Sequence, residues 1–132
     1  MVVFQLLISK GFDINKLNSS NETPLYLAVC KRNKEMVKSL INSNCDVNIK
    51  EGTVSKSILS VAIQIAETTI AKMLIKAGCD VNSTDKNGVT PLMECVTNDN
   101  QSITEVLLKA GANVNHCDKS RQTPLMNAYH AS

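Results

Sequence analysis

Gly11-Phe12-Asp13-Ile14-Asn15 is the first of four short segments that recur along this 132-residue chain at almost constant spacing. The other three are Asn44-Cys45-Asp46-Val47-Asn48, Gly78-Cys79-Asp80-Val81-Asn82 and Gly111-Ala112-Asn113-Val114-Asn115, so the steps are 33, 34 and 33 residues. A fixed period of about 20 to 50 residues indicates a stack of repeated units, not a domain with one closed core. Such stacks usually present an extended binding surface, and we therefore expect a binding protein.

A second segment keeps the same register between the copies of the first. It reads Thr23-Pro24-Leu25, then Ser57-Ile58-Leu59, Thr90-Pro91-Leu92 and Thr123-Pro124-Leu125. A Thr or Ser hydroxyl can accept a hydrogen bond from the free amides of a first helical turn. Pro fits the first helical position because its missing amide is not needed there. Each of these segments therefore predicts the start of a short helix.

A second, more apolar helix is predicted in each unit. The apolar residues within 36–41 have the i, i+1, i+4, i+5 spacing of a buried helix face, and the other units repeat it. Gly11, Gly78 and Gly111 follow these helices where a left-handed residue is needed, and Asn44 takes that position once. The unit is therefore a helix, a turn, a second helix, a glycine and an extended linker.

These features together resemble the ankyrin repeat, whose period is about 33 residues. The resemblance covers essentially the whole chain and implies an all-α solenoid of helix-turn-helix units joined by hairpin fingers. It implies a half repeat at 1–15, full repeats at 16–48, 49–82 and 83–115, and a half repeat at 116–132. Such arrays normally close with polar capping repeats, so we interpret the chain as a fragment of a longer array. The alternative is that the ends stack on another copy or on a partner.

The charge balance and the cysteines limit the classes of partner and location. Fourteen basic residues against twelve acidic ones give a net charge of +2 without a run of five like charges. Neither nucleic acid nor a membrane surface is therefore expected as a partner. The five cysteines are odd in number and contain no C-x-x-C pair, which favours a reducing, cytoplasmic or nuclear location. We expect Cys45 and Cys79, which share one register position, to be small buried residues.

Residues of catalytic or metal-binding type form no recognisable motif. His116 and Cys117 are adjacent, and adjacent side chains rarely face each other, while a third orienting group is missing. His116 and His130 with scattered cysteines lack the spacing of a zinc site. No glycine-rich phosphate-binding loop is present. We therefore expect no enzyme activity, cofactor or metal; turnover that is lost on mutation of His116 or Cys117 would support the alternative, an enzyme.

The stretches 16–22, 49–56, 83–89 and 116–122 correspond to the hairpin fingers of the ankyrin family. Asp85-Lys86-Asn87-Gly88 has the Asp and Gly of a tight turn. Asp118-Lys119-Ser120-Arg121 has Arg where Gly is expected, so this finger is either distorted or strained by roughly 1 kcal/mol. The finger at 49–56 carries one extra residue, which is either drift in a tolerant loop or a reshaped contact. Glu94 has apolar counterparts, and we expect it to face the last unit, where Asn127 is also polar.

In similar ankyrin domains, partners dock on the concave surface made by finger tips and the exposed side of the first helices. The resemblance therefore implies a non-catalytic scaffold that binds another protein, although each position is also consistent with plain solvated surface. The alternative is a regulatory or targeting segment, or a structural spacer, of a larger multidomain ankyrin-repeat protein. The implied contact residues are Ser19, Ser20, Glu22, Lys31, Val54, Lys56, Gln64, Lys86, Asn87, Val89, Thr97, Asn98, Lys119, Ser120 and Gln122.

The resemblance also implies a site of modification. In animals, ankyrin arrays are frequent substrates of an asparaginyl hydroxylase that acts on the Asn of Asp-Val-Asn with a Leu eight residues before it. Three asparagines fit this pattern, namely Asn15, Asn48 and Asn82. The simpler interpretation is that these side chains hydrogen-bond the finger backbone.

Overall fold

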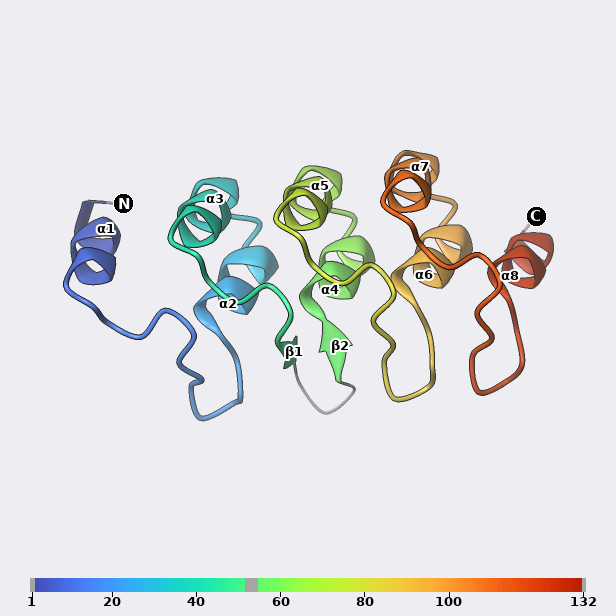
Figure 1. Ribbon diagram of the computed structural model, residues 1–132, viewed down its shortest axis with the longest axis horizontal. Coiled ribbons are helices and arrows are strands. Elements are labelled where there is room, and N and C mark those ends of the chain that lie inside the picture. Colours follow the sequence, from blue (N-terminus) through green and yellow to red (C-terminus); the bar gives the residue numbers. More distant parts are fainter. Residues whose placement is uncertain (1, 52–54, 132) are drawn as a thin grey trace.

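The computed structural model describes residues 2–51 and 55–131. Pairs of short helices stand side by side along one axis in the order of the sequence, and loops project from one edge (Figure 1). The first and the last described helix lie at opposite ends of this row. In each full unit, each helix packs on the other helix of its own unit and on the corresponding helices of the neighbouring units. The prediction of an all-α solenoid is confirmed.

The first helix of each unit begins where the sequence predicts it. These first helices are α2 (Pro24–Cys30), α4 (Ile58–Gln64), α6 (Pro91–Thr97) and α8 (Pro124–Ala131). The Thr23 hydroxyl accepts a hydrogen bond of 3.1 Å from the amide of Tyr26, so it caps α2. Ser57 caps α4 in the same way at 3.2 Å, although its unit lacks the Thr-Pro pair.

The second helices are α1 (Val2–Ser9), α3 (Lys34–Asn42), α5 (Thr68–Lys76) and α7 (Gln101–Lys109). Each is followed by a residue with positive φ: 80° at Gly11, 61° at Asn44 and 89° at both Gly78 and Gly111. This left-handed conformation turns the chain away from the helix, which is why glycine is favoured there. The helix ends expected from these four residues are therefore confirmed.

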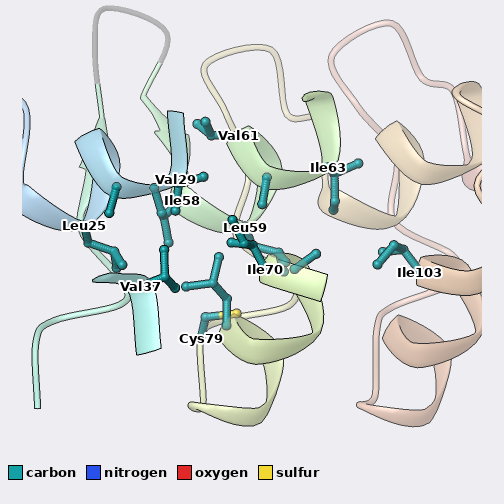
Figure 2. Close-up of a cluster of buried hydrophobic side chains, with 14 of the residues drawn as sticks. Leu25, Val29, Val37, Ile58, Leu59, Val61, Ile63, Ile70, Cys79 and Ile103 are labelled. Carbon is teal, nitrogen blue, oxygen red and sulfur yellow. The ribbon is translucent and has the colours of Figure 1, made fainter. Parts of the chain in front are cut away.

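The core is a row of thin layers shared between neighbouring units. Figure 2 shows Leu25 of α2, Ile58 of α4 and Ile70 of α5 within one cluster of buried side chains. The leucines at one register position of the second helices, Leu40 and Leu74, are both fully buried. Cys45 and Cys79 are buried too, as predicted. Each unit therefore depends on its neighbours to cover its apolar face.

The linkers that follow the second helices are joined by asparagine side chains. Oδ1 of Asn15 accepts a hydrogen bond of 2.8 Å from the amide of Asp46. Asn48 accepts from Asp80 and Asn82 from Asn113, each at 2.7 Å. The partner of each side chain is thus the next linker and not a finger, because equivalent linkers of successive units run side by side.

Candidate protein-binding surface

Three of the fingers share one hydrogen-bonded turn. At the finger 83–89, the amide of Asp85 donates to the carbonyl oxygen of Val89 (3.1 Å), and the amide of Gly88 donates to that of Asp85 (3.0 Å). Oδ1 of Asp85 accepts from the amides of Asn87 (2.8 Å) and Val89 (3.0 Å). Asn18 and Asp118 make the same four bonds in their fingers. The finger tips are therefore formed before any partner arrives, which lowers the entropic cost of docking.

The finger with Arg in place of Gly is strained and not distorted. Arg121 has a φ of 63°, close to the 77° of Gly88, and its amide still donates to the carbonyl oxygen of Asp118 at 3.0 Å. A side chain in this left-handed conformation costs roughly 1 kcal/mol. The hydrogen bonds made by Asp118 hold the turn in place despite that cost.

The last two fingers are fixed against each other. The amide of Lys119 donates to the carbonyl oxygen of Asn87 at 3.0 Å, and Nε2 of His116 lies 2.9 Å from the carbonyl oxygen of Gly88. A carbonyl oxygen only accepts, so Nε2 carries the proton in this contact. A Cβ added at Gly88 would lie 3.3 Å from Cα of Asp118, which leaves little room for a larger residue. His116 therefore serves here as a bridge between fingers.

The irregular finger has strand pairing at its base. β1 (Lys50–Glu51) and β2 (Lys56–Ser57) are antiparallel, and Lys50 pairs with Ser57. Nζ of Lys50 donates to the carbonyl oxygen of Thr84 at 2.7 Å, which ties this finger to the next one. Val54, a predicted contact residue, lies outside the described residues.

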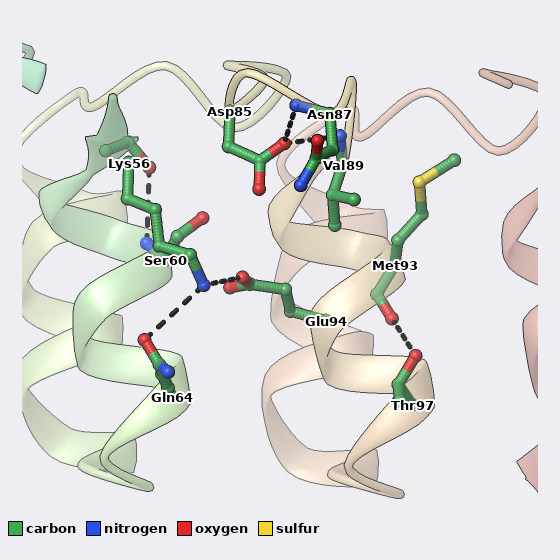
Figure 3. A network of polar contacts seen from close by, with 10 residues as sticks. Lys56, Ser60, Gln64, Asp85, Asn87, Val89, Met93, Glu94 and Thr97 are labelled. Carbon is green, nitrogen blue, oxygen red and sulfur yellow. Dashed lines mark hydrogen bonds and ion pairs between the residues drawn. The ribbon is translucent and has the colours of Figure 1, made fainter. Parts of the chain in front are cut away.

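An ion pair crosses the middle of the surface formed by the finger tips and the exposed side of the first helices, which we call the finger face. Nζ of Lys56 lies 2.6 Å from Oε1 of Glu94, and it also donates to Oε1 of Gln64 at 3.4 Å (Figure 3). The two charged side chains are only 21% and 14% exposed. The expectation that Glu94 faces the last unit is wrong, because its carboxylate points toward Lys56 of the preceding finger. Its other oxygen, Oε2, is buried without a hydrogen-bond partner among the described residues.

A hollow of about 290 Å³ adjoins this pair on the finger face. Five of the six residues that line it were predicted as contact residues: Lys56, Gln64, Val89, Thr97 and Asn98. The sixth is Glu94, which the footprint taken from the resemblance missed. The signal in the sequence was a charged residue at a register position that is apolar in two other units.

The other predicted residues lie along the same row, away from the hollow. Lys31 caps the C-terminus of α2 and is exposed. Nδ2 of Asn18 donates to the carboxylate of Glu22 at 2.9 Å, so part of this side chain is engaged within its finger. The exposed members of the row at the finger tips are Ser19, Ser20, Lys86, Asn87, Lys119 and Ser120, and Gln122 is half-buried.

The described residues hold no group that suggests catalysis. Within 2–51 and 55–131, no cluster of three or more His, Cys, Asp or Glu side chains could hold a metal ion. Burial, assisted by the neighbouring Glu94 carboxylate, raises the pKa of Cys95 to about 12, and burial raises the pKa of Cys45 and Cys79 to about 11. These three thiols are therefore protonated at neutral pH and are poor nucleophiles. None of the described helices has the length and apolar character needed to cross a bilayer.

Known sequences resemble this chain over most of its length. The family described as ankyrin repeats (3 copies) matches residues 1–51 and 59–132. Ankyrin repeat protein FPV223 of fowlpox virus (strain NVSL) is 34% identical over 97 residues, which cover 74% of this chain and 67% of the viral protein. FPV024 of the same virus is 31% identical over 95 residues, covering 72% of this chain but 16% of that protein. The E3 ubiquitin-protein ligase HACE1 of Xenopus tropicalis is 32% identical over 81 residues, 58% of this chain and 9% of the ligase.

Proposed function

Because this chain belongs to the ankyrin-repeat family, whose repeats generally mediate protein–protein interaction, we propose that it is a non-catalytic scaffold. Its partner is another protein, which docks on the concave surface of finger tips and first helices. The observation that carries this proposal is the hollow of about 290 Å³, because it gathers five predicted contact residues from two neighbouring units.

The electrostatics of the finger face support a polar partner surface. Lys31, Lys86 and Lys119 are exposed, and none of them takes part in an ion pair among the described residues. Exposed, unpaired charges at an interface mainly set the rate and specificity of association. Affinity is more often concentrated in a few well-packed contacts near the centre, where the hollow lies.

The test is a pull-down from cell lysate with identification of captured proteins by mass spectrometry. The finger-face variant carries Lys31→Glu, Lys86→Glu and Lys119→Glu, three exposed side chains, so the fold is expected to survive. The matched control carries Lys10→Glu, Lys16→Glu and Lys34→Glu, three exposed lysines that are not predicted contact residues, with the same change in net charge. A partner lost only by the finger-face variant supports the proposal, whereas equal capture by all three proteins contradicts it.

A second candidate is a regulatory or targeting segment, or a structural spacer, of a larger multidomain protein. The matches cover only 16% of FPV024 and 9% of HACE1, and these small shares favour a segment of a larger protein. The complete reading frame of the transcript decides between the two. A further domain in frame would support the segment, and a frame that ends at Ser132 and begins at Met1 would contradict it.

We also propose that Asn15, Asn48 and Asn82 are substrates of an asparaginyl hydroxylase. The support is the spacing of Leu and Asp-Ile/Val-Asn in the sequence. The Oδ1 atoms of all three side chains are engaged with the next linker, so modification requires these bonds to open. Incubation with such an enzyme, dioxygen and a two-electron co-reductant should convert one C–H bond per site to C–OH. Each site would then gain about 16 mass units, the mass of one oxygen atom. An unchanged intact mass would remove this proposal.

Self-association through the ends is a further proposal for the 132-residue chain. Leu125 and Tyr129 of α8 are 80% and 79% exposed, and Val3 of α1 is 69% exposed. Exposed apolar surface of this kind favours association. Light scattering should show a mass that rises with concentration, and Leu125→Glu with Tyr129→Glu should abolish the rise. A constant monomeric mass of the unmodified chain would contradict the proposal.

A cytoplasmic or nuclear location is likewise proposed. It is supported by the five cysteines, none of which forms a disulfide in the structure. Proteins of oxidising compartments usually pair their cysteines. Microscopy of the tagged protein in cells tests the location, and a secreted or luminal signal would contradict it.

A further inference from the structure

A second groove lies on the side of the molecule formed by the second helices, away from the fingers. Figure 1 places α3, α5 and α7 in a row along the edge opposite the finger tips. The groove between α3 and α5 has a volume of about 500 Å³. Half-buried Ile41 and Met73 supply apolar surface, and the exposed Lys38 and Lys76 stand beside them. Methionine is common at surfaces that accept varied apolar side chains, because its thioether chain adapts its shape.

The second helices together carry a net positive charge. Their five lysines and two glutamates leave three positive charges, whereas the whole chain has a net charge of +2. The ion pairs among the described residues are Arg32–Glu67 and Lys56–Glu94, and neither involves a lysine of these helices. All five lysines are exposed, namely Lys34, Lys38, Lys72, Lys76 and Lys109. The lysines of this edge are therefore not paired with a carboxylate among the described residues.

The lysines recur with the period of the solenoid. Lys38 and Lys72 occupy one register position in neighbouring units, and Lys76 and Lys109 occupy another. Neighbouring packed helices lie about 8–10 Å apart. A peptide in the extended polyproline II conformation has three residues per turn and rises about 3.1 Å per residue, so every third side chain lies on the same side, about 9 Å apart. Carboxylates at every third residue of such a segment would therefore match one lysine on each of α3, α5 and α7.

We propose that this groove binds an extended acidic segment of a partner protein. One apolar side chain of the segment lies between Ile41 and Met73, and its carboxylates, three residues apart, pair with Lys38 of α3, Lys76 of α5 and Lys109 of α7. This surface is separate from the finger face and does not depend on the scaffold function proposed for it. A lipid surface is disfavoured because, among the described residues of α3, α5 and α7, only Leu108 is a large exposed apolar side chain, and it is 45% exposed. Membrane-surface helices need such side chains for insertion.

The test uses a fluorescent peptide of about twelve residues that carries Glu at every third position and one Leu beside the second Glu. Fluorescence anisotropy should show binding that weakens with added salt. The groove variant Lys38→Glu with Lys76→Glu should weaken binding by at least about tenfold. The control variant Lys16→Glu with Arg121→Glu has the same net charge, alters exposed basic residues outside both the groove and the predicted contact residues, and should bind within about twofold of the unmodified chain.

Two further measurements test the shape of the site. Met73→Ser should weaken binding by about threefold or more, because it removes apolar surface from the groove without changing a charge. A scrambled peptide with its glutamates adjacent should bind about tenfold more weakly. Equal binding by the groove and control variants, equal binding of the scrambled peptide, or no binding at about 1 mM would each overturn the proposal. So would capture of the protein by phosphatidylserine vesicles through Lys38 and Lys76 in place of the peptide.

Discussion

Lys56 and Glu94 form an ion pair of 2.6 Å between a finger and the first helix of the following unit. The equivalent pairs at the neighbouring boundaries are Glu22 with Val61 and Val89 with Asn127, and neither pair can form a salt bridge. The contact is therefore specific to one boundary of the solenoid. It lies beside the hollow of the finger face, so it links the packing of α4 against α6 to the surface proposed for partner binding.

Removing one member of this pair should cost more than removing both. Lys56→Val leaves the Glu94 carboxylate largely buried without a cation, and we expect a loss of about 2 kcal/mol in the free energy of unfolding. The double variant Lys56→Val with Glu94→Val should be more stable than Lys56→Val alone by at least about 1 kcal/mol, because no unpaired buried charge remains. Urea unfolding of the unmodified protein, Lys56→Val, Glu94→Val and the double variant measures this coupling. Single effects that simply add would show that the pair contributes nothing.

The asparagine bonds between linkers should stabilise the contact between units. Asn48→Ala removes the acceptor for the amide of Asp80, and we expect a loss of about 1 kcal/mol. Asn115 occupies the same position in the last such segment, and its side chain makes no hydrogen bond among the described residues. Asn115→Ala is therefore the control and should change stability by less than about 0.5 kcal/mol. Equal losses in chemical denaturation would contradict a role for the linker bond.

The turn between α4 and α5 contains a residue that is strained by its conformation. Ala66 has a φ of 60°, where a Cβ is unfavourable and glycine is not. Ala66→Gly should therefore raise the free energy of unfolding by about 0.5 to 1 kcal/mol. Ala77 has a φ of −75°, and Ala77→Gly should lower stability, because glycine there only increases the freedom of the unfolded chain. Thermal unfolding of both variants measures whether stability rises or falls in each. A change in the same direction for both variants would contradict the role assigned to φ.

Alkaline pH should destabilise the fold through its buried thiols. Burial, followed by the nearby Asp80 carboxylate, raises the pKa of Cys79 from 9.0 to about 11. The stabilising contribution is complete below the unfolded pKa and is lost as pH rises from about 9 through the folded value. Cys79→Ala, which copies Ala112 of the next unit, should flatten the fall in stability above about pH 9. Cys30→Ala alters an exposed thiol and should leave that slope unchanged, which is checked by unfolding at several pH values.

The regular part of the fold was predictable because it depends on contacts that every unit repeats. The Thr or Ser caps, the buried leucine stripe and the left-handed residue after each second helix all act within a few residues of one another. The hydrogen-bond pattern of the finger at Asp118 is also local, since one side chain organises the turn. Whether Arg121 would distort it could not be predicted, because that depends on a balance between a strained φ and these bonds.

The sequence by itself determined the period and the helix order, because local hydrogen bonds and apolar spacing encode them. The row of contact residues came from the family resemblance and stays a prediction. Only the tertiary structure decided which residues of different units meet. Lys56 pairs with Glu94 across 38 positions, and Asn48 reaches Asp80 across 32. These contacts depend on the rotation and offset between stacked units, which side-chain packing sets jointly over several helices. The register position of a residue predicts which face its side chain occupies. The packing of the neighbouring unit determines which residues that side chain contacts.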